Sequence, residues 1–142
     1  MRKNILDLIQ SNNLCVLATL SNGEPHCSLM SYVADTNSRE IYMVTQRETK
    51  KYRNLKENPS VSLLIDTRQT DNKNRIKALT ITGTFQDSID ENKKSIIRAR
   101  LLERHPDLKE FIDDPAAEII AVKFKAIQLL DGIKDSYFET VV

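Results

Sequence analysis

Short runs of aliphatic and β-branched residues, separated by turn residues, recur along most of the chain. Runs of this length and composition are typical of β-strands. In the clearest run, Leu79, Ile81 and Phe85 alternate with threonines, so we expect one face to be core and the other polar. Gly83 within it indicates a bulge or a close approach by another backbone. The pattern predicts six strands, over residues 14–20, 25–34, 41–45, 61–65, 79–86 and 118–130.

Four other segments are predicted to be helical. The second of them ends before Pro59, because the residue before a proline is pushed out of the helical backbone region. The third opens with Ser88 followed three residues later by Glu91, the pattern of a capping box. Its apolar side is predicted to consist of Ile89, Ile96, Ile97 and Leu101. The predicted helices cover residues 2–11, 49–58, 89–104 and 107–112.

The connections between the predicted strands are mostly tight turns, of which Asn22-Gly23 is the strongest hairpin signal. Strands joined by such turns favour antiparallel pairing, and six of them point to a small closed or partly closed barrel. The 142 residues are expected to form a single domain over 1–142. The tail from residue 135 receives no predicted element, so its Tyr137 and Phe138 either cover a partner or a ligand, or close one end of the core.

Composition narrows the classes of partner. The net charge is +1, so the chain as a whole carries no basic field for nucleic acid or an acidic membrane. Hydrophobic residues make up 40% of the chain, as in ordinary globular domains, and no run reaches the length of a spanning helix. The first residues carry Asp7 and Gln10 among their apolar positions and do not resemble a signal peptide, so a cytoplasmic location is expected.

Cysteine and histidine supply no metal or catalytic constellation in the sequence. A turn centred on Asn22-Gly23 places Cys27 opposite Ala18 and Cys15 opposite Met30, so the two thiols are not cross-strand partners and are expected to be reduced. The two histidines, His26 and His105, lie far apart and have no acidic or thiol companion nearby in the sequence. We therefore expect neither a metal site nor an acid–base residue.

One stretch, residues 41–66, contains a strand, a helix and a second strand in that order. Arg47, Lys50 and Lys51 lie around the start of the helix, where free N–H groups already make the backbone partly positive. Cations at that end are unfavourable unless an anion such as a phosphate binds there as well. Two interpretations stay open at this point: a phosphate-binding site, or solvated surface lysines offset by Glu48.

The hairpin sequence NGEPHCSLM and the block TQRETKK–helix–NPSVSLLID, in this order of elements, resemble the pyridoxamine 5′-phosphate oxidase-like split barrels. The similarity runs from Leu14 to Asp131 and is sharpest between Val44 and Leu64. It implies a mainly β fold with peripheral helices, a six-stranded antiparallel Greek-key split barrel. It also implies a homodimer that binds FMN in clefts at the subunit interface.

The resemblance assigns roles to particular residues. Lys50 and Lys51 are similar to the positions that hold the FMN phosphate, with Thr49 nearby as a hydroxyl donor. Val44 and Thr45 correspond to the strand end that meets the flavin. The strand beneath the isoalloxazine ring, where the family uses mainly backbone hydrogen bonds, would contribute Cys27, Ser28, Leu29 and Met30.

Two departures argue against pyridoxamine phosphate as the substrate. True oxidases of that substrate carry an arginine where this chain has Cys27, and they end with an arginine–histidine pair that the tail DSYFETVV lacks. The resemblance instead implies an FMN flavoprotein that passes electrons from a reduced donor to a small acceptor. The alternative is a non-catalytic flavin, deazaflavin or haem module for storage or redox sensing, and haem would need His26 or His105 as its axial ligand.

Overall fold

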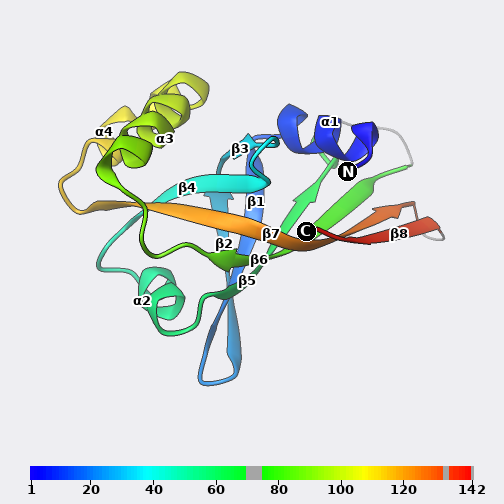
Figure 1. Cartoon of the computed structure of the whole chain (residues 1–142), viewed down its shortest axis with the longest axis horizontal. Helices are drawn as coiled ribbons and strands as arrows, with labels where there is room; N and C mark the ends of the chain where they lie inside the picture. The colour runs from blue at the N-terminus through cyan, green and yellow to red at the C-terminus, as the bar shows by residue number, and fades with distance from the viewer. Residues whose placement is uncertain (70–74, 133–134, 142) are drawn as a thin grey trace.

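The computed structural model describes residues 1–69, 75–132 and 135–141. Within these residues the chain forms one antiparallel sheet and a set of peripheral helices (Figure 1). The strands are β1 Leu14–Ser21, β2 Glu24–Ser31, β3 Val33–Asp35, β4 Glu40–Gln46, β5 Ser60–Asp66, β6 Lys77–Phe85, β7 Ala117–Asp131 and β8 Asp135–Thr140. The helices are α1 Lys3–Ser11, α2 Lys50–Glu57, α3 Glu91–Arg104 and α4 Lys109–Ile112, with a 3₁₀ turn at Pro106–Leu108.

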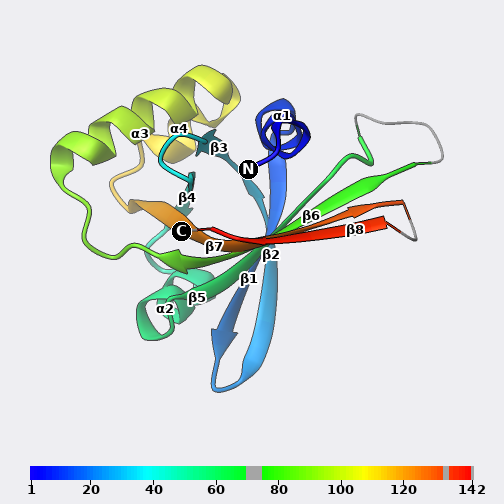
Figure 2. The ribbon, with the colours of Figure 1, turned by 45° about the vertical axis from the view of Figure 1, so that its right-hand side comes forward.

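The strands pair in the order β2-β1-β5-β6-β7-β4-β3, and β8 pairs with β7. The long strand β7 pairs with β4 through its first half and with β8 through its second. The sheet curls strongly, so that the β1–β2 hairpin and the arm made by β6, β7 and β8 extend in different directions (Figure 2). This curled antiparallel sheet is the split barrel that the sequence resemblance implies.

The split lies between β2 and β4. Along the edge of β4 that faces the split, only residues 40–42 pair with β3. The rest of this edge, from Met43 to Gln46, has no strand partner among the described residues. The outer edge of β2 is likewise unpaired there, because β2 pairs only with β1. β2 and β4 nevertheless come into contact. Main-chain hydrogen-bonding groups therefore line both sides of the split.

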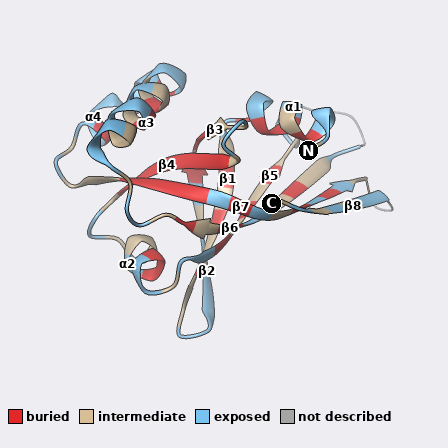
Figure 3. Cartoon of the chain, in the orientation of Figure 1, coloured by how far each residue is buried: buried red, intermediate tan, exposed pale blue. Residues whose placement is uncertain are grey.

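Two apolar cores hold the fold together, and Figure 3 shows the buried positions. The main core fills the barrel and includes Ile5, Leu8 and Ile9 of α1, which form one apolar stripe of that helix as the sequence predicts. A second core lies between α3 and the outer side of β4 and β7, where Ile97 and Leu101 pack against Tyr42 and Val44. None of the helices in the described ranges is long and apolar enough to cross a bilayer.

Gly83 marks the bulge that its position in the alternating strand indicates. The pairing of β6 with β7 shifts register between Thr82 and Gly83. A Cβ atom at Gly83 would lie 2.6 Å from Val122 Cγ1 and 2.7 Å from the carbonyl oxygen of Lys123, closer than side-chain atoms tolerate. The alternation around it is also confirmed, since Leu79, Ile81 and Phe85 are buried.

The strand count of six is wrong, because the described residues form eight strands. The run predicted as one strand over 25–34 breaks at Tyr32 into β2 and β3, since β3 turns away to pair with β4. The tail with no predicted element is β8, which adds to the free edge of β7. Within β8, Tyr137 packs against the main core with Arg2 3.5 Å above its ring, whereas Phe138 faces outward.

Two predictions about α3 are also wrong. The N-cap is Asp90, whose carboxylate accepts a 2.8 Å hydrogen bond from the backbone N–H of Lys93, and Ser88 lies outside the helix. Ile96 belongs to the exposed side, with 55% of its surface accessible, because the helix turns Ile97 and Leu101 toward the sheet. The polar loop predicted between residues 68 and 75 falls mostly outside the described residues.

Candidate functional site

The start of α2 gathers hydroxyl groups and cations, as the sequence predicts. Thr49 is the N-cap, and its Oγ1 accepts from the backbone N–H of Tyr52 at 3.3 Å while donating to the carbonyl of Gln46 at 2.9 Å. Thr45, at the end of β4, brings its own Oγ1 within 3.4 Å of the Thr49 hydroxyl. Lys50 and Lys51 follow directly, and no acidic residue lies in this first turn.

The lysines at this helix start differ from the other cations near α2. Arg47 pairs with Glu118 at 2.9 Å, and Lys56 at the far end of the helix pairs with Asp87 at 2.7 Å. Neither Lys50 nor Lys51 takes part in an ion pair with another described residue. The residual positive charge therefore lies at the positive end of the helix dipole, which is the arrangement that favours an anion.

Buried contacts fix α2 against the barrel and so fix the position of its first turn. Asn54 donates a 3.1 Å hydrogen bond from Nδ2 to Oγ1 of Thr19 on β1, and both side chains are buried. Leu55 is fully buried in the main core. The ring of Tyr52 packs edge-on against Phe85 with 6.5 Å between centroids. Asn54 and Thr19 are not predictable as buried partners from the sequence, because a single polar residue in a helix or strand carries no local signal of burial.

The residues expected to meet a flavin lie on the two strand edges of the split. Val44 and Thr45 are buried at the end of β4, next to the unpaired edge. On β2 the four expected residues alternate: Ser28 and Met30 face inward, while Cys27 and Leu29 face out and are exposed. The split thus places the two sets on opposite sides of one opening, and the phosphate-binding candidates at the end of β4.

The outer face of the sheet carries no charged side chain over two successive cross-strand rows. The strand registers place Leu29, Val16, Leu64, Thr80, Gln128 and Phe138 in one row and Cys27, Ala18, Ser62, Thr82, Ala126 and Thr140 in the next. We call these twelve residues the uncharged face. Leu29 and Phe138, at the two ends of the first row, are 70% and 66% exposed. A large uncharged face with exposed apolar side chains is typical of an interaction surface.

Three hollows on the described surface lie away from the phosphate-binding candidates. One of about 240 Å³ lies at the edge of the uncharged face, over Val16, Leu29 and Leu64. A second, of about 440 Å³, lies between α1, β3 and α3 and is lined by Arg100 and Arg104. The third, of about 490 Å³, lies beside the β3–β4 turn.

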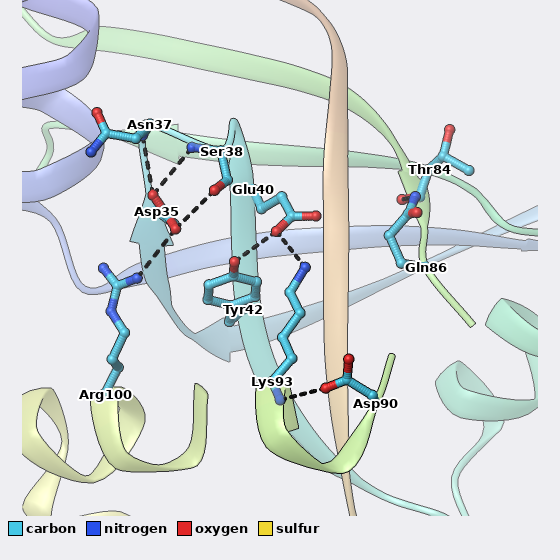
Figure 4. A network of polar contacts seen from close by, with 10 residues as sticks. All are labelled: Asp35, Asn37, Ser38, Glu40, Tyr42, Thr84, Gln86, Asp90, Lys93 and Arg100. Atoms are coloured by element: carbon cyan, nitrogen blue, oxygen red, sulfur yellow. Dashed lines mark hydrogen bonds and ion pairs between the residues drawn. The ribbon is translucent and has the colours of Figure 1, made fainter. Parts of the chain in front are cut away.

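A polar network at the β3–β4 turn, shown in Figure 4, connects α3 to the sheet. Buried Glu40 accepts hydrogen bonds from Tyr42 Oη at 2.7 Å and from Lys93 Nζ at 2.9 Å. Burial, followed by the hydrogen bond to Glu40, raises the pKa of the Tyr42 hydroxyl. Asp35 is partly desolvated, but hydrogen bonds from Ser38 and Asn37 and the charge of Arg100 hold its pKa below the ordinary value. Each group has a partner, so the network stabilises the helix–sheet contact.

The two histidines are separated in the fold as well as in the sequence. His105 is buried after α3, and its Nε2 lies 2.8 Å from the carbonyl oxygen of Tyr32. His26 lies on β2 opposite Thr19, near the tip of the hairpin.

The thiols follow their predicted register, with Cys15 opposite Met30 and Cys27 opposite Ala18, and both are free. Burial raises the pKa of the Cys15 thiol to about 12.

Comparison with known proteins agrees with the fold and narrows the family. The heme binding protein of Mycobacterium smegmatis superposes with a TM-score of 0.83 over 99% of this chain and 59% of its own, at 18% identity. An FAD-binding protein of Mesorhizobium loti superposes with a TM-score of 0.76 over 94% of this chain and 96% of its own, at 14% identity. At these identities the likeness shows the fold alone.

Sequence comparison gives the family itself. General stress protein 26 of Bacillus subtilis (strain 168) is 31% identical over 65 residues, which is 46% of this chain and 45% of that protein. The match thus spans less than half the length of this curated relative. The sequence pattern described as pyridoxamine 5′-phosphate oxidase matches residues 1–131. This chain belongs to the pyridoxamine 5′-phosphate oxidase family.

Proposed function

We propose that this protein binds FMN in the split between β2 and β4 and, as a homodimer, passes electrons from a small reduced donor to a small acceptor. The single observation that carries the proposal is the cluster at the start of α2. There, two lysines without an ion-pair partner among the described residues adjoin the helix N-terminus and the hydroxyls of Thr45 and Thr49. The lysines and the N–H groups of the first turn fit a phosphate monoester, because they combine positive charge with hydrogen-bond donors, whereas the Thr49 hydroxyl donates to the Gln46 carbonyl and caps the helix.

The position of the split supports the rest of the cofactor. A flavin ring presents carbonyl and nitrogen groups along its edge, and the unpaired edges of β2 and β4 offer main-chain donors and acceptors to such a ring. Val44 and Thr45 on one side and Cys27 to Met30 on the other are the residues proposed to flank it. When bound, FMN supplies the hydride and electron chemistry, so the protein need only bind and orient it.

The uncharged face supports the homodimer. When two copies associate through a sheet face, the burial of apolar side chains favours the association. Charged side chains that lose their hydration oppose it. The twelve residues of this face include four large aliphatic or aromatic side chains and no Lys, Arg, Asp or Glu. The face adjoins β2, so a second copy bound there would also lie next to the split.

The competing proposal is a module that binds flavin or haem without turnover. One solved structure with this fold is a heme binding protein and another is an FAD-binding protein. Haem requires an axial ligand, and His105 is poorly placed for this role, because it is buried and its Nε2 contacts the Tyr32 carbonyl. His26 on the exposed hairpin would be the remaining imidazole. The histidines thus give haem little support, whereas the lysines at the start of α2 support a flavin that carries a phosphate.

The visible spectrum of the purified protein tests these alternatives. We expect flavin absorption that bleaches with NADH or NADPH under anaerobic conditions and recovers when a quinone or nitro compound is added. Bound flavin that turns over with none of these acceptors would support storage or sensing, and a Soret band would support haem. A protein that stays colourless after incubation with excess FMN would contradict the proposal.

The two free thiols fit the reducing cytoplasm, where we propose that the protein acts.

A further inference from the structure

We infer that the hollow beside the β3–β4 turn binds a small molecule that carries a doubly charged oxyanion, such as a phosphate monoester, on an apolar body. The hollow has a volume of about 490 Å³, and its lining comes from this turn, α3, β7 and the end of the chain. It lies at the first residue of β4, whereas the proposed FMN phosphate site lies beyond the last. Roughly 20 Å of strand separates the two sites.

The charges that line the hollow do not cancel. Three cationic side chains, Arg39, Lys93 and Lys123, share the lining with one carboxylate, that of Glu40. This carboxylate is buried and already accepts from Lys93 Nζ at 2.9 Å and from Tyr42 Oη at 2.7 Å. Arg39 and Lys123 form no ion pair with another described residue. The lining therefore carries an excess of two positive charges, which matches a dianion.

The neighbouring carboxylates outside the lining have partners of their own. Asp35 pairs with Arg100 at 3.7 Å, and Asp90 caps the N-terminus of α3. Glu139 on β8 interacts with Arg39, but it also pairs with the N-terminal amine at 3.7 Å. None of the three carboxylates is part of the lining, which therefore keeps its excess positive charge.

The backbone at Arg39 is held in an unfavourable conformation. Its φ of 56° lies in the left-handed region, which glycine or asparagine adopts more readily than arginine. The Asp35 carboxylate accepts from the N–H groups of Asn37 and Ser38, and the Arg39 carbonyl accepts from the N–H of Phe124 at 3.0 Å, so the turn is fixed on both sides. Strained residues that are fixed in this way concentrate at binding sites. A ligand for the guanidinium explains why a long cation occupies a position suited to glycine.

The lining divides into a cationic part and an apolar part. Arg39 Nη1 donates to the Thr36 carbonyl at 2.8 Å, which leaves most N–H groups of the guanidinium for a ligand. Guanidinium and ammonium groups form strong, charge-assisted hydrogen bonds with phosphate and carboxylate oxygens. Phe124 and Val141 supply the apolar part. This combination selects a molecule with a charged head and an apolar body.

Titration of the ¹⁵N-labelled protein with phenyl phosphate, followed by two-dimensional NMR, tests the site. We expect saturable shifts of the Asn37, Ser38 and Phe124 amides, weaker binding of inorganic phosphate, and no shift with phenol, which lacks the charge. The amides of Lys50 and Lys51 report phosphate at α2 separately in the same spectra. Unshifted amides at residues 37, 38 and 124 with both phosphates would overturn the inference.

Phthalate distinguishes the two kinds of doubly charged ligand, because it carries two carboxylates on the same ring. Tighter binding of phenyl phosphate than of phthalate at these amides assigns a phosphate monoester to the site. The reverse order assigns a dicarboxylate. If neither compound shifts these amides, the hollow is not an oxyanion site.

Two variants show which side chains hold the ligand. Arg39→Gly removes the guanidinium and suits the positive φ, so the variant should fold like wild type and bind phenyl phosphate roughly 10- to 150-fold more weakly, as for hydrogen bonds to a charged group. Lys123→Gln should also weaken binding. Lys125→Gln, an exposed cation two residues along β7 and outside the lining, is the matched control and should keep wild-type affinity. Circular dichroism verifies folding, and wild-type affinity in both Arg39→Gly and Lys123→Gln would contradict the inference.

Discussion

The Asn54 side chain of α2 donates a 3.1 Å hydrogen bond to the Thr19 hydroxyl of β1, and the two residues are only 3% and 1% exposed. This contact connects the helix that carries Lys50 and Lys51 to the wall of the barrel. It lies about one turn beyond these lysines, so it fixes the direction in which the helix N-terminus points. A buried polar pair of this kind is costly to break on one side only.

We therefore expect Asn54→Leu or Thr19→Val alone to lower the free energy of unfolding by about 1–3 kcal/mol, because each leaves a buried polar group without its partner. The double variant should lose less than the sum, with a coupling of about 0.5–3 kcal/mol. Urea unfolding of the four proteins measures the cycle. Additive effects of the two substitutions would show that the hydrogen bond contributes nothing specific to stability.

Replacement of the lysines tests the phosphate-binding proposal directly. Lys50→Ala and Lys51→Ala should each weaken FMN binding by about 1.5–3 kcal/mol, or roughly ten- to 150-fold, as expected for hydrogen bonds to a charged group. Riboflavin, which lacks the phosphate, should bind equally to wild type and variants. Lys56→Ala in the last turn of the same helix is the control and should leave FMN affinity unchanged. Fluorescence titration of the flavin measures all four proteins.

Much of the fold follows from local patterns in the sequence. The Asn22-Gly23 turn adopts positive φ values of 53° and 78°, and this local geometry sets the register that pairs Cys27 with Ala18. Thr49 as a helix cap and Gly83 at the close approach of two strands are also local features. At each position the backbone requires one type of residue, and the sequence has it there. Such features could be predicted because the interactions that determine them lie within a few residues.

The missed features depend on contacts between distant segments. β8 forms because the second half of β7 has a free edge, and nothing in residues 135–140 alone distinguishes a strand from a tail. Ser88 and Asp90 both match helix caps, and the choice depends on how α3 packs its Ile97 and Leu101 on the sheet. The uncharged face was likewise not recognised, since its rows appear only when the registers of six strands are combined.

The cap of α3 gives a matched pair of substitutions. Asp90→Ala removes the carboxylate that accepts from the Lys93 N–H at 2.8 Å, and we expect it to lower the free energy of unfolding by about 0.5–2 kcal/mol. Ser88→Ala should change it by less than about 0.5 kcal/mol, because Ser88 is exposed and lies outside the helix. Thermal or urea unfolding distinguishes them, and a larger loss for Ser88→Ala would restore the capping box.

The buried thiol of Cys15 predicts a loss of stability at alkaline pH. Burial raises its pKa from the ordinary value of 9.0 to about 12, so the folded protein keeps the proton over a range in which the unfolded chain releases it. The unfolded state then binds fewer protons, and the free energy of unfolding must fall as pH rises above about 9. The contribution is fully present below pH 9 and reaches a slope of up to about 1.4 kcal/mol per pH unit.

Cys15→Ala should flatten this decline, although the cavity that it creates lowers stability at every pH. The slope between pH 8 and 9.8, rather than the absolute value, is therefore the quantity to compare. That window lies below the ordinary pKa of 10.0 of Tyr32 and Tyr42, whose pKa values burial also raises and which add their own decline above it. Cys27→Ala removes an exposed thiol and should retain the wild-type slope. Equal slopes for wild type and Cys15→Ala in urea unfolding would show that the Cys15 thiol ionises as readily in the folded protein as in the unfolded chain.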